Sequence, residues 1–318
     1  MQAIARLAAA FAAVLLLTAS TIAFAEHVHE PRAVLVTGAS SGIGRNIAET
    51  LAANGFHVYA GARKDKDLAE LNAIDNVTAV RLDVTKQDEI DAAAALVEAE
   101  GRGLYGLVNN AGVAVFGTAS QMTDSDIEWL FDINVFGVAR VTRAFSPMII
   151  EAKGRIVTTG SISGILSSPT LAAYSMSKHA VEAFTDSLAA ELAPAGVHVS
   201  VVEPGNYKSR IRRTTVSRMR RQMEAAGVEL DEQTSQRMQQ IADREETLKE
   251  PDDVSAAVMH AMNNENPQRR YMVVPVVNEA EITIRKAIEE LVQLNEWHVH
   301  RYDRDELVDM LDEALNKL

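Results

Sequence analysis

The chain has 318 residues and contains no cysteine. This absence excludes disulfide bonds, thiolate nucleophiles and cysteine-based metal sites. Basic residues are in the minority, because 31 lysines and arginines stand against 44 aspartates and glutamates and give a formal net charge of −13 at pH 7. A nucleic-acid partner needs a basic face for its phosphates. The charge balance therefore argues against nucleic-acid binding.

Histidine does not suggest a metal site either. Two H-x-H pairs occur, at 27–29 and 298–300. Neither pair has a third histidine or a set of carboxylates at ligand spacing. Both pairs are interpreted as surface or tail residues, and no bound metal is expected.

Charged residues are missing from one stretch near the N-terminus. No charge occurs between Arg6 and Glu26, and the stretch ends in Ala23-Phe24-Ala25, a small-x-small pattern. This layout predicts a secretory signal peptide over residues 1–25 and an exported protein, periplasmic or secreted. An uncleaved membrane anchor is the alternative, since roughly 20 apolar residues span a bilayer. Both interpretations place the main domain outside the cytoplasm, whereas a downstream start would leave the protein cytoplasmic.

From residue 33 onward, short apolar runs alternate with longer amphipathic stretches. The expected strands are 33–38, 57–62, 77–84, 106–112, 154–161, 197–205 and 270–276. The expected helices are 42–54, 86–100, 123–150 and 172–195. Runs that are apolar on both faces and alternate with helices predict an α/β fold. We expect a doubly wound, Rossmann-like parallel sheet of about seven strands in one domain, residues 26–277.

The pattern changes after residue 205. Residues 207–249 are polar and helical, and the segment 206–250 is predicted to be a substrate lid. Residues 278–318 resemble two helices without a strand between them, which predicts a helical C-terminal extension. An oligomer contact, a pocket cover and a solvated helical surface all remain possible roles for these segments.

The sequence TGASSGIG, residues 37–44, directly follows the first expected strand and opens the first helix. Gly38 permits a tight turn, Gly42 lets a phosphate approach the backbone, and Gly44 lets the helix pack against the sheet. Free N–H groups at a helix start bind phosphate. We therefore expect a dinucleotide here, with Ser40, Ser41 and Ile43 completing the loop.

The end of the second strand bears on which dinucleotide is bound. An NAD-binding fold usually places a carboxylate there for the ribose 2′-OH. This chain has Ala62 followed by Arg63 and Lys64. A guanidinium suits a 2′-phosphate, because arginine and phosphate pair through two hydrogen bonds. NADP is therefore favoured, and NAD remains possible with Arg63 as an ordinary surface residue.

Tyr174 and Lys178 stand four residues apart in the alanine-rich sequence AAYSMSKHA. Side chains at this spacing share one face of a helix. A free phenol titrates near pH 10, and a nearby cation favours the phenolate. The pair is thus suited to general acid/base chemistry near neutral pH.

Three motifs in order resemble those of the short-chain dehydrogenase/reductase family. They are the glycine spacing G-x-x-x-G-x-G at 38–44, NNAG at 109–112 and Y-x-x-x-K at 174–178. The resemblance covers roughly residues 32–277. It implies a nicotinamide cofactor and the interconversion of alcohols and carbonyl compounds.

The resemblance implies four catalytic residues. Tyr174 corresponds to the general acid/base, and Lys178 to the lysine that binds the nicotinamide ribose and lowers the pKa of the tyrosine. Ser161 corresponds to the serine that polarises the carbonyl, and a hydroxyl there can donate to the developing oxyanion. Asn134 corresponds to a helix asparagine that holds a water of the proton relay.

The resemblance also implies cofactor contacts at the ends of three strands. These residues are Asp83 and Val84 for adenine, Asn109, Ala111 and Gly112 for the adenosine ribose, and Pro204 and Gly205 for the nicotinamide. Ser209 stands where the family usually has threonine, and it keeps the hydroxyl.

Together these features predict an NADP(H)-dependent oxidoreductase that interconverts an alcohol and a ketone or aldehyde. A small apolar substrate is expected, because the segment after Gly205 and the tail are rich in aliphatic side chains. The sequence EPGNYKSRI is similar to a loop of family members that act on steroids and retinoids. An NAD-dependent alcohol dehydrogenase and a non-catalytic nucleotide-binding sensor remain alternatives. The family implies a homo-oligomer, either a dimer or a tetramer.

Overall fold

The structure is a computed structural model that describes residues 31–317. The predicted signal peptide, residues 1–25, and the histidine pair at 27–29 lie outside this part, so both interpretations stay predictions. Within residues 31–317, no helix has the length and apolar character needed to cross a membrane. No group of three or more potential metal ligands occurs in the same part of the chain.

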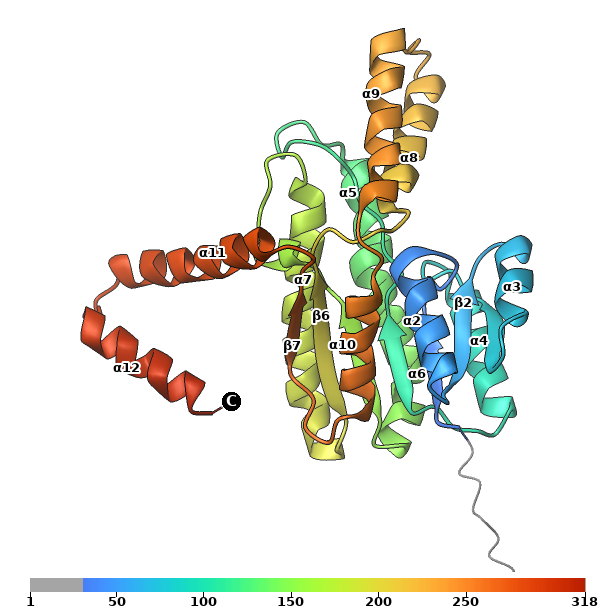
Figure 1. Ribbon diagram of the computed structural model, residues 1–318, viewed down its shortest axis with the longest axis horizontal. Helices are drawn as coiled ribbons and strands as arrows, with labels where there is room; N and C mark the ends of the chain where they lie inside the picture. Colours follow the sequence, from blue (N-terminus) through green and yellow to red (C-terminus); the bar gives the residue numbers. More distant parts are fainter. Residues whose placement is uncertain (1–30, 318) are drawn as a thin grey trace, which may run out of the picture. The chain divides into compact units, whose positions relative to one another are not determined.

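A seven-stranded parallel sheet forms the centre of the fold (Figure 1). The strands are β1 (Ala33–Val36), β2 (His57–Ala62), β3 (Val77–Arg81), β4 (Gly106–Asn109), β5 (Arg155–Thr159), β6 (His198–Pro204) and β7 (Arg270–Val273). Their order is β3-β2-β1-β4-β5-β6-β7. The order reverses between β1 and β4, as in a doubly wound sheet that binds its ligand at that point. The predicted fold class and all seven predicted strands are confirmed.

Several strands end before the apolar runs that predict them. The run 77–84 is a strand only to Arg81, and the run 106–112 only to Asn109. The remaining residues of these runs form loops at the carboxyl edge of the sheet. In open α/β sheets this edge carries the ligand site, so the predicted cofactor residues Asp83 and Gly112 lie in loops.

Helices cover both faces of the sheet. They include α2 (Gly42–Ala53), α3 (Asp65–Asn72), α4 (Gln87–Ala99), α6 (Gly137–Glu151), α7 (Ala172–Leu192) and α10 (Asp252–Asn263). Successive residues of a strand point to opposite faces. Leu35 therefore packs in the apolar cluster shared with α4, α6 and α7, and Val36 packs in the cluster shared with α2 and α10.

The helix predicted at 123–150 is interrupted. A π-helical segment, Asp132–Phe136, joins α5 (Asp124–Phe131) to α6. Such segments occur frequently at functional sites. The interruption falls on Asn134, which is one of the predicted catalytic residues.

The segment predicted as a lid forms a helical hairpin. It consists of α8 (Ile211–Ala225) and α9 (Glu232–Asp243), which pack together through Val216 and Met238. In Figure 1 the hairpin stands at the end of the sheet where β6 finishes. This is the end that carries the predicted site.

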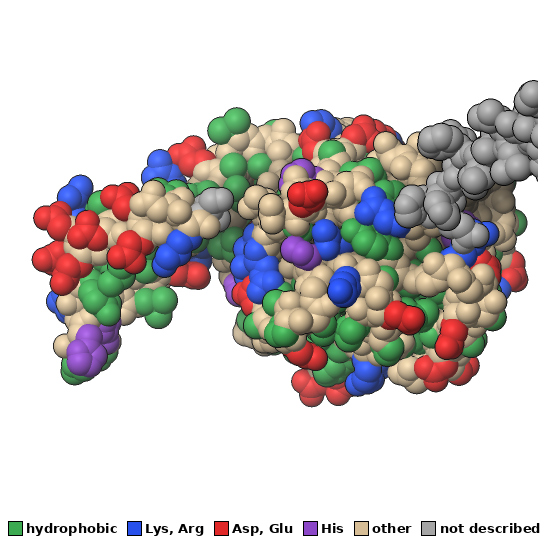
Figure 2. All heavy atoms as spheres, turned by 90° about the horizontal axis from the view of Figure 1, so that it is seen from below, with side chains coloured by type: hydrophobic (Ala, Val, Ile, Leu, Met, Phe, Trp, Pro, Cys, Tyr) green, Lys and Arg blue, Asp and Glu red, His purple; other side chains and the backbone are tan. Residues whose placement is uncertain are grey.

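Two further helices follow β7, as predicted. They are α11 (Val277–Glu296) and α12 (Arg304–Leu315). We call residues 284–317 the C-terminal arm. The arm lies at the left of Figure 2, where apolar, acidic and basic side chains are all exposed on its surface.

Candidate active site

Tyr174 and Lys178 lie one turn apart on α7. Lys178 is only 7% exposed, and its Nζ donates a hydrogen bond to the carbonyl oxygen of Thr159 at the end of β5 (2.8 Å). The same Nζ lies 5.7 Å from the centre of the Tyr174 ring. The structure therefore places the phenol beside the ammonium, as the four-residue spacing predicts.

Ser161 follows β5 and begins a short 3-10 turn, Ile162–Gly164. Its Oγ accepts a hydrogen bond from the backbone N of Ser163 (3.1 Å) and donates to the carbonyl oxygen of Pro204 (3.5 Å). Its hydroxyl is also within hydrogen-bond reach of the Tyr174 side chain. Two hydroxyl groups thus converge on one spot above the end of the sheet.

Asn134 is 2% exposed, and every atom of its amide group that can form a hydrogen bond has a partner. Its Oδ1 accepts from the backbone N of Val113, and its Nδ2 donates to the carbonyl oxygen of Val113, both at 2.9 Å. The Nδ2 also donates to Ser177 Oγ (3.1 Å), which in turn donates to the carbonyl oxygen of Tyr174 (2.8 Å). Asn134 therefore ties α7 to the loop after β4 and holds the helix that carries Tyr174 in place.

Burial dominates the ionisation of the tyrosine and the lysine. It raises the pKa of Tyr174 above the ordinary value of a phenol, and the hydrogen bond with Ser161 only partly opposes this. It also lowers the pKa of Lys178 to about 8, against a smaller effect of the Glu182 carboxylate. The expectation that the lysine lowers the pKa of the tyrosine stays a prediction, because the net rise reflects burial. Loss of water around the phenolate disfavours the charged form of the tyrosine.

The glycine loop turns tightly from β1 into α2. Gly38 has a φ of +67°, and a Cβ there would lie 2.8 Å from the Cα of Ala111. A Cβ at Gly44 would overlap the Nδ2 of Asn110 and the carbonyl oxygen of Gly38. The side chain of Ser41 does not cap α2. The first-turn N–H groups of α2 are thus placed to bind an anion.

Thr37 and Asn110 lock this loop to the end of β4. Asn110 belongs to the predicted NNAG turn at 109–112, whereas Thr37 is not marked by any motif. Thr37 Oγ1 accepts from the backbone N of Asn110 (2.9 Å) and of Ala111 (3.0 Å). Asn110 Nδ2 donates to the carbonyl oxygen of Thr37 (3.0 Å). Asn109 is 3% exposed, and its Nδ2 donates instead to Thr142 Oγ1 on α6 (2.9 Å).

The combination of this loop with the Tyr174 site matches a known family. The family model described as short chain dehydrogenase matches residues 32–220, which is more than half of the chain. The chain belongs to the short-chain dehydrogenase family. The resemblance predicted from the three motifs is confirmed.

Relatives of this short-chain dehydrogenase match about half of its length. The mitochondrial D-beta-hydroxybutyrate dehydrogenase of Bos taurus is 41% identical over 186 residues, which are 55% of this chain and 54% of the relative. Retinol dehydrogenase 16 of Homo sapiens is 38% identical over 183 residues, which are 56% of this chain and 57% of the relative. The chain thus matches only about half the length of these relatives.

Solved structures of the family share the fold over a longer region. A short-chain dehydrogenase from Streptomyces avermitilis is 31% identical, with a TM-score of 0.69, and covers 85% of this chain and 97% of its own. A short-chain dehydrogenase/reductase from Burkholderia phymatum in complex with NAD is 28% identical, with a TM-score of 0.69, and covers 86% and 98%. Actinorhodin polyketide ketoreductase with NADPH is 27% identical, with a TM-score of 0.64, and covers 77% and 95%. Structural neighbours of this short-chain dehydrogenase therefore bind either cofactor.

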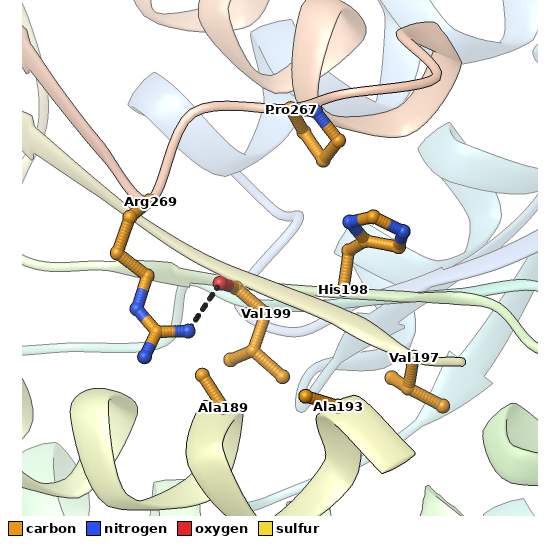
Figure 3. Close-up of a pocket in the computed structure, with 7 residues that line it drawn as sticks. All are labelled: Ala189, Ala193, Val197, His198, Val199, Pro267 and Arg269. Carbon is orange, nitrogen blue, oxygen red and sulfur yellow. Dashed lines mark hydrogen bonds between the residues drawn. The ribbon is translucent and has the colours of Figure 1, made fainter. Parts of the chain in front are cut away.

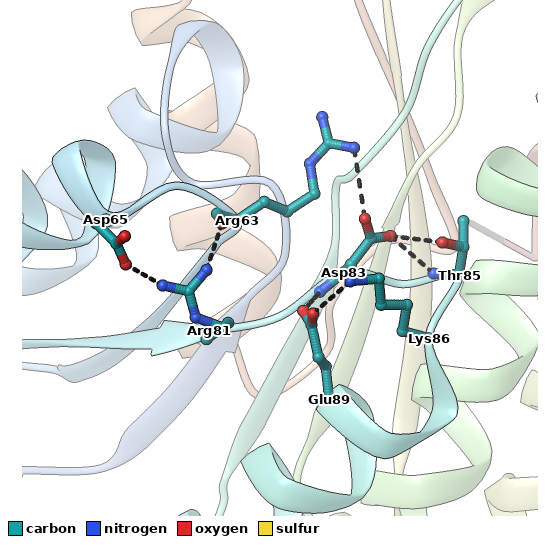
Figure 4. A network of polar contacts seen from close by, with 7 residues as sticks. All are labelled: Arg63, Asp65, Arg81, Asp83, Thr85, Lys86 and Glu89. Atoms are coloured by element: carbon teal, nitrogen blue, oxygen red, sulfur yellow. Dashed lines mark hydrogen bonds and ion pairs between the residues drawn. The ribbon is translucent and has the colours of Figure 1, made fainter.

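Two predicted cofactor residues of this short-chain dehydrogenase, Arg63 and Asp83, form an ion pair (3.6 Å; Figure 4). Asp83 Oδ1 also accepts from the backbone N (3.0 Å) and the Oγ1 (2.8 Å) of Thr85. Burial opposes ionisation of Asp83, but these hydrogen bonds and the guanidinium together hold its pKa below the ordinary value. The side chain of Arg63 is 61% exposed. The guanidinium of Arg63 can therefore reach a ligand next to Asp83. Val84, the next residue in the chain, packs into the core.

The loop after β6 contains Pro204 and Gly205, and α11 holds it from behind. The backbone N of Gly205 donates to the carbonyl oxygen of Val273 (2.8 Å). Glu279 on α11 accepts from the backbone N (3.2 Å) and the Nδ2 (2.6 Å) of Asn206. A Cβ at Gly205 would overlap this carboxylate. Glu279 thus fixes the predicted nicotinamide loop, a role that only the folded chain reveals.

Two cavities differ in their relation to this site. A cavity of about 520 Å³ is lined by Ser40, Ser41 and Gly42 on one side and by Lys208, Ser209 and Arg210 on the other. Ser209 therefore faces the glycine loop, as the family pattern implies. A cavity of about 270 Å³ lies between the end of α7 and the start of β6 (Figure 3). None of the predicted site residues lines this second cavity.

Proposed function

We propose that this protein is an NADP(H)-dependent oxidoreductase that interconverts an alcohol and a ketone or aldehyde. The observation that carries this is the convergence of Tyr174, Ser161 and Lys178 beside the glycine loop. They supply a proton donor, a second hydroxyl donor and a cation, which carbonyl reduction needs from the protein. The printed names of the relatives, dehydrogenases and a ketoreductase, support the reaction class.

The residues present fit a nicotinamide dinucleotide. The uncapped start of α2 offers N–H groups for a pyrophosphate, and Gly38 and Gly44 leave no room for a side chain at the turn. Arg63 and Asp83 are placed for the adenosine end. We assign the nicotinamide ribose to Lys178, whose Nζ is tied to the end of β5. When bound, the cofactor supplies the hydride.

The side chains of the site divide the remaining chemistry between them. Tyr174 Oη is placed to donate its proton to a carbonyl oxygen. Ser161 Oγ donates a second hydrogen bond to the same oxygen and stabilises the negative charge that develops there. The raised pKa of Tyr174 keeps the phenol protonated at neutral pH. This state supports reduction of a carbonyl, whereas oxidation of an alcohol needs the phenolate.

The contacts of the α8–α9 hairpin support its proposed role as a lid over a small apolar substrate. Thr215 Oγ1 on α8 donates to the carbonyl oxygen of Ala114 in the loop after β4 (2.9 Å). Arg218 forms an ion pair with Asp126 on α5 (2.8 Å) and stacks over Trp129 at 4.0 Å. The base of the hairpin thus lies against the two segments that border the site.

The proposed activity is tested by NADPH oxidation with a panel of aliphatic and aromatic ketones and aldehydes, and by NADP reduction with the matching alcohols. Turnover with apolar members of the panel is the expected result. Cofactor binding without turnover of any member would instead favour the alternative of a nucleotide-binding sensor.

Replacing Arg63 by alanine tests the preference for NADP. A 2′-phosphate pairs with a guanidinium through charged hydrogen bonds worth about 1.5–3 kcal/mol. Arg63→Ala should therefore raise KM for NADPH about 10- to 100-fold and leave KM for NADH nearly unchanged. Lys66→Ala is the matched control, because it removes an exposed cation whose one ion pair within residues 31–317 is with Glu70 (3.8 Å). Equal effects on both cofactors would mean that Arg63 does not read the 2′-phosphate.

A further inference from the structure

Two buried carboxyl groups lie directly beneath the candidate active site. Glu182 is on α7, one turn after Lys178, and is 9% exposed. Glu203 is on β6, immediately before Pro204, and is 2% exposed. The packing of α7 against β6 brings the two carboxyl groups within hydrogen-bond reach of each other.

One arginine lies against both carboxyl groups. Arg270 on β7 places its Nε 3.4 Å from Glu182 Oε2 and 3.5 Å from Glu203 Oε1. Its Nη2 forms a shorter ion pair with Asp186 (2.6 Å). The other charged groups around the pair are Lys178 on α7 and Arg269 before β7. Arg270 is thus shared among three carboxyl groups and pairs best with Asp186.

Adjacent buried carboxylates repel each other, so the two groups do not readily carry a negative charge at the same time. Among the described residues, the two oxygens of Glu182 and the Oε1 of Glu203 have no hydrogen-bond donor. A proton held between the two groups supplies that donor. Burial, followed by the proximity of Glu203, raises the pKa of Glu182 to about 7. Burial likewise raises the pKa of Glu203.

Glu182 contacts two parts of the catalytic machinery. A Cβ at Gly160 would lie 2.8 Å from Glu182 Oε1, so the carboxyl group lies against the turn that carries Ser161. Burial lowers the pKa of Lys178, and the charge of Glu182 acts against this. Loss of a proton from Glu182 therefore raises the pKa of Lys178.

We propose that Glu182 and Glu203 share one proton beneath the active site and thereby set the pH range in which Lys178 stays charged. Both act as positioning residues. As the pH rises, the pair releases its proton to solvent, and the added negative charge keeps Lys178 protonated. The ammonium favours the phenolate of Tyr174. The consequence for catalysis rests on the proposed function, whereas the shared proton does not.

The shared proton is tested without substrate, by the free energy of unfolding as a function of pH. A carboxyl group whose pKa rises on folding stabilises the protein fully below its ordinary value of 4.5, and this contribution is lost as the pH rises through about 7. Wild-type protein should lose stability relative to Glu182→Gln over this range. Glu191→Gln, at an exposed position of the same helix, should follow the wild type.

A difference between wild type and Glu182→Gln that stays constant from pH 4.5 to 7 overturns the shared proton. If Glu182→Gln does not fold, Glu203→Gln takes its place, because the pair titrates as a unit. Glu203→Gln should likewise flatten the pH dependence. Full wild-type pH dependence in Glu203→Gln would also contradict the shared proton.

The effect on Lys178 is tested by the pH profile of kcat/KM for alcohol oxidation. Without the charge of Glu182, Lys178 loses its proton at lower pH and supports the phenolate less. The apparent pKa of the acid limb of this profile should therefore be about half a unit higher in Glu182→Gln than in the wild type. This shift is roughly a threefold change in proton affinity. An unchanged acid limb overturns the positioning role. A wild type without turnover contradicts the proposed function and leaves the stability test intact.

A different observation concerns the C-terminal arm. The start of α11 is anchored, because Glu279 holds Asn206 and Thr283 is fully buried. Beyond that point Ile284, Leu291 and Leu294 are 51%, 50% and 76% exposed. No part of the described chain covers these side chains. Figure 2 shows apolar side chains on the arm between charged groups.

Six of the apolar residues of α11 form a regular stripe. They recur at alternating spacings of three and four residues, and they are Val277, Ala280, Ile284, Ala287, Leu291 and Leu294. Ile282, Ile288 and Val292 lie outside this spacing. This period of 3.5 residues is that of a helix that packs along another helix. The alanines alternate with larger side chains along part of the stripe, which lets a partner helix approach closely.

The charges on the arm indicate what that partner is. The arm carries nine acidic and five basic residues, which disfavours an anionic membrane surface. Arg285 and Lys286 precede Glu290 and Glu296 along α11. Within one copy, Arg285 pairs with Glu281 (2.8 Å) and Lys286 pairs with Glu290 (3.0 Å). An antiparallel copy of the same helix sets unlike charges against each other and satisfies both copies equally.

We propose that α11 packs antiparallel against α11 of a second copy of this chain. Light scattering coupled to size-exclusion chromatography measures the mass of the assembly. Leu291→Glu places a charge on the stripe and should halve the mass of the wild-type assembly. Ile282→Glu makes the same change on the opposite side of α11, at a residue that is 42% exposed, and should leave the mass unchanged.

Three results overturn this pairing. They are a monomeric wild type, a Leu291→Glu variant of wild-type mass, and an arm that binds lipid vesicles in a monomeric protein. Circular dichroism provides the control for folding, because equal helix content in the three proteins ties a change in mass to the interface. The pairing is independent of the proposed enzymatic activity.

Discussion

Replacing Tyr174 by phenylalanine is expected to lower kcat for carbonyl reduction by about 10²- to 10⁴-fold, the usual effect of losing a positioned general acid. The side chain is partly buried beside Ser161 and lies next to Lys178. A phenyl ring fits the same space, so the Kd for NADPH should change by less than about threefold, within 1 kcal/mol. Steady-state kinetics and cofactor titration together measure both effects.

Tyr271→Phe is the matched control for this substitution. The Tyr271 hydroxyl lies on β7 and contacts His260 (2.8 Å) and the backbone N of Gln268 (2.8 Å), outside the proposed site. Its loss should leave kcat unchanged. If Tyr174→Phe kept more than about a tenth of the wild-type kcat, or if both variants lost activity equally, the phenol would not be the general acid.

Replacing Gly44 by alanine is expected to disrupt the cofactor site and the fold together. A Cβ would overlap the Asn110 amide and the carbonyl oxygen of Gly38, and this backbone cannot yield as a flexible side chain can. Overpacking of this kind costs about 1–3 kcal/mol of stability. The start of α2 must shift away from β4, so the Kd for NADP(H) should rise at least about tenfold.

Thermal denaturation and cofactor titration check the effects of Gly44→Ala. Gly117→Ala is the control, because a Cβ there would meet only the flexible side chain of Met122, at 3.0 Å. It should change neither the Tm nor the Kd appreciably. Normal cofactor affinity in a folded Gly44→Ala protein would show that the glycine loop does not hold the pyrophosphate.

Interactions that are local in sequence were predictable. The four-residue spacing of Tyr174 and Lys178 sets them on one face of α7, and the structure shows them as neighbours. The alternation of apolar runs with helices predicts the parallel sheet, and the β1–α2 turn follows from its glycines. The sequence of α10 also has helical spacing, since Val254 and Val258 lie four residues apart and are both buried.

Features that depend on contacts between distant segments were not predictable. The pairing of Glu182 with Glu203 depends on how α7 packs against β6, and no motif marks either residue. The same holds for Glu279, which reaches Asn206 only after the chain has completed the sheet. The raised pKa of Tyr174 also depends on the fold, because it results from burial, which the spacing of the motif does not show.

The π-helical segment at Asp132–Phe136 is another feature that depends on contacts between distant segments. A continuous helix over 123–150 was expected because the amphipathic pattern runs through the segment unbroken. The insertion becomes understandable in the fold, where Asn134 forms hydrogen bonds with Val113 and Ser177 at the same time. Local propensity does not report such a constraint.

Transfer of the hydride to a carbonyl substrate tests the central claim most directly. NADPH deuterated at C4 of the nicotinamide is incubated with the purified protein and an apolar ketone, and the alcohol is examined by mass spectrometry. We predict that wild-type protein places deuterium on the carbinol carbon, and that Tyr174→Phe binds the labelled cofactor but forms product at least about 10²-fold more slowly. A wild-type protein that binds the cofactor and transfers no deuterium to any member of the carbonyl panel would contradict the account.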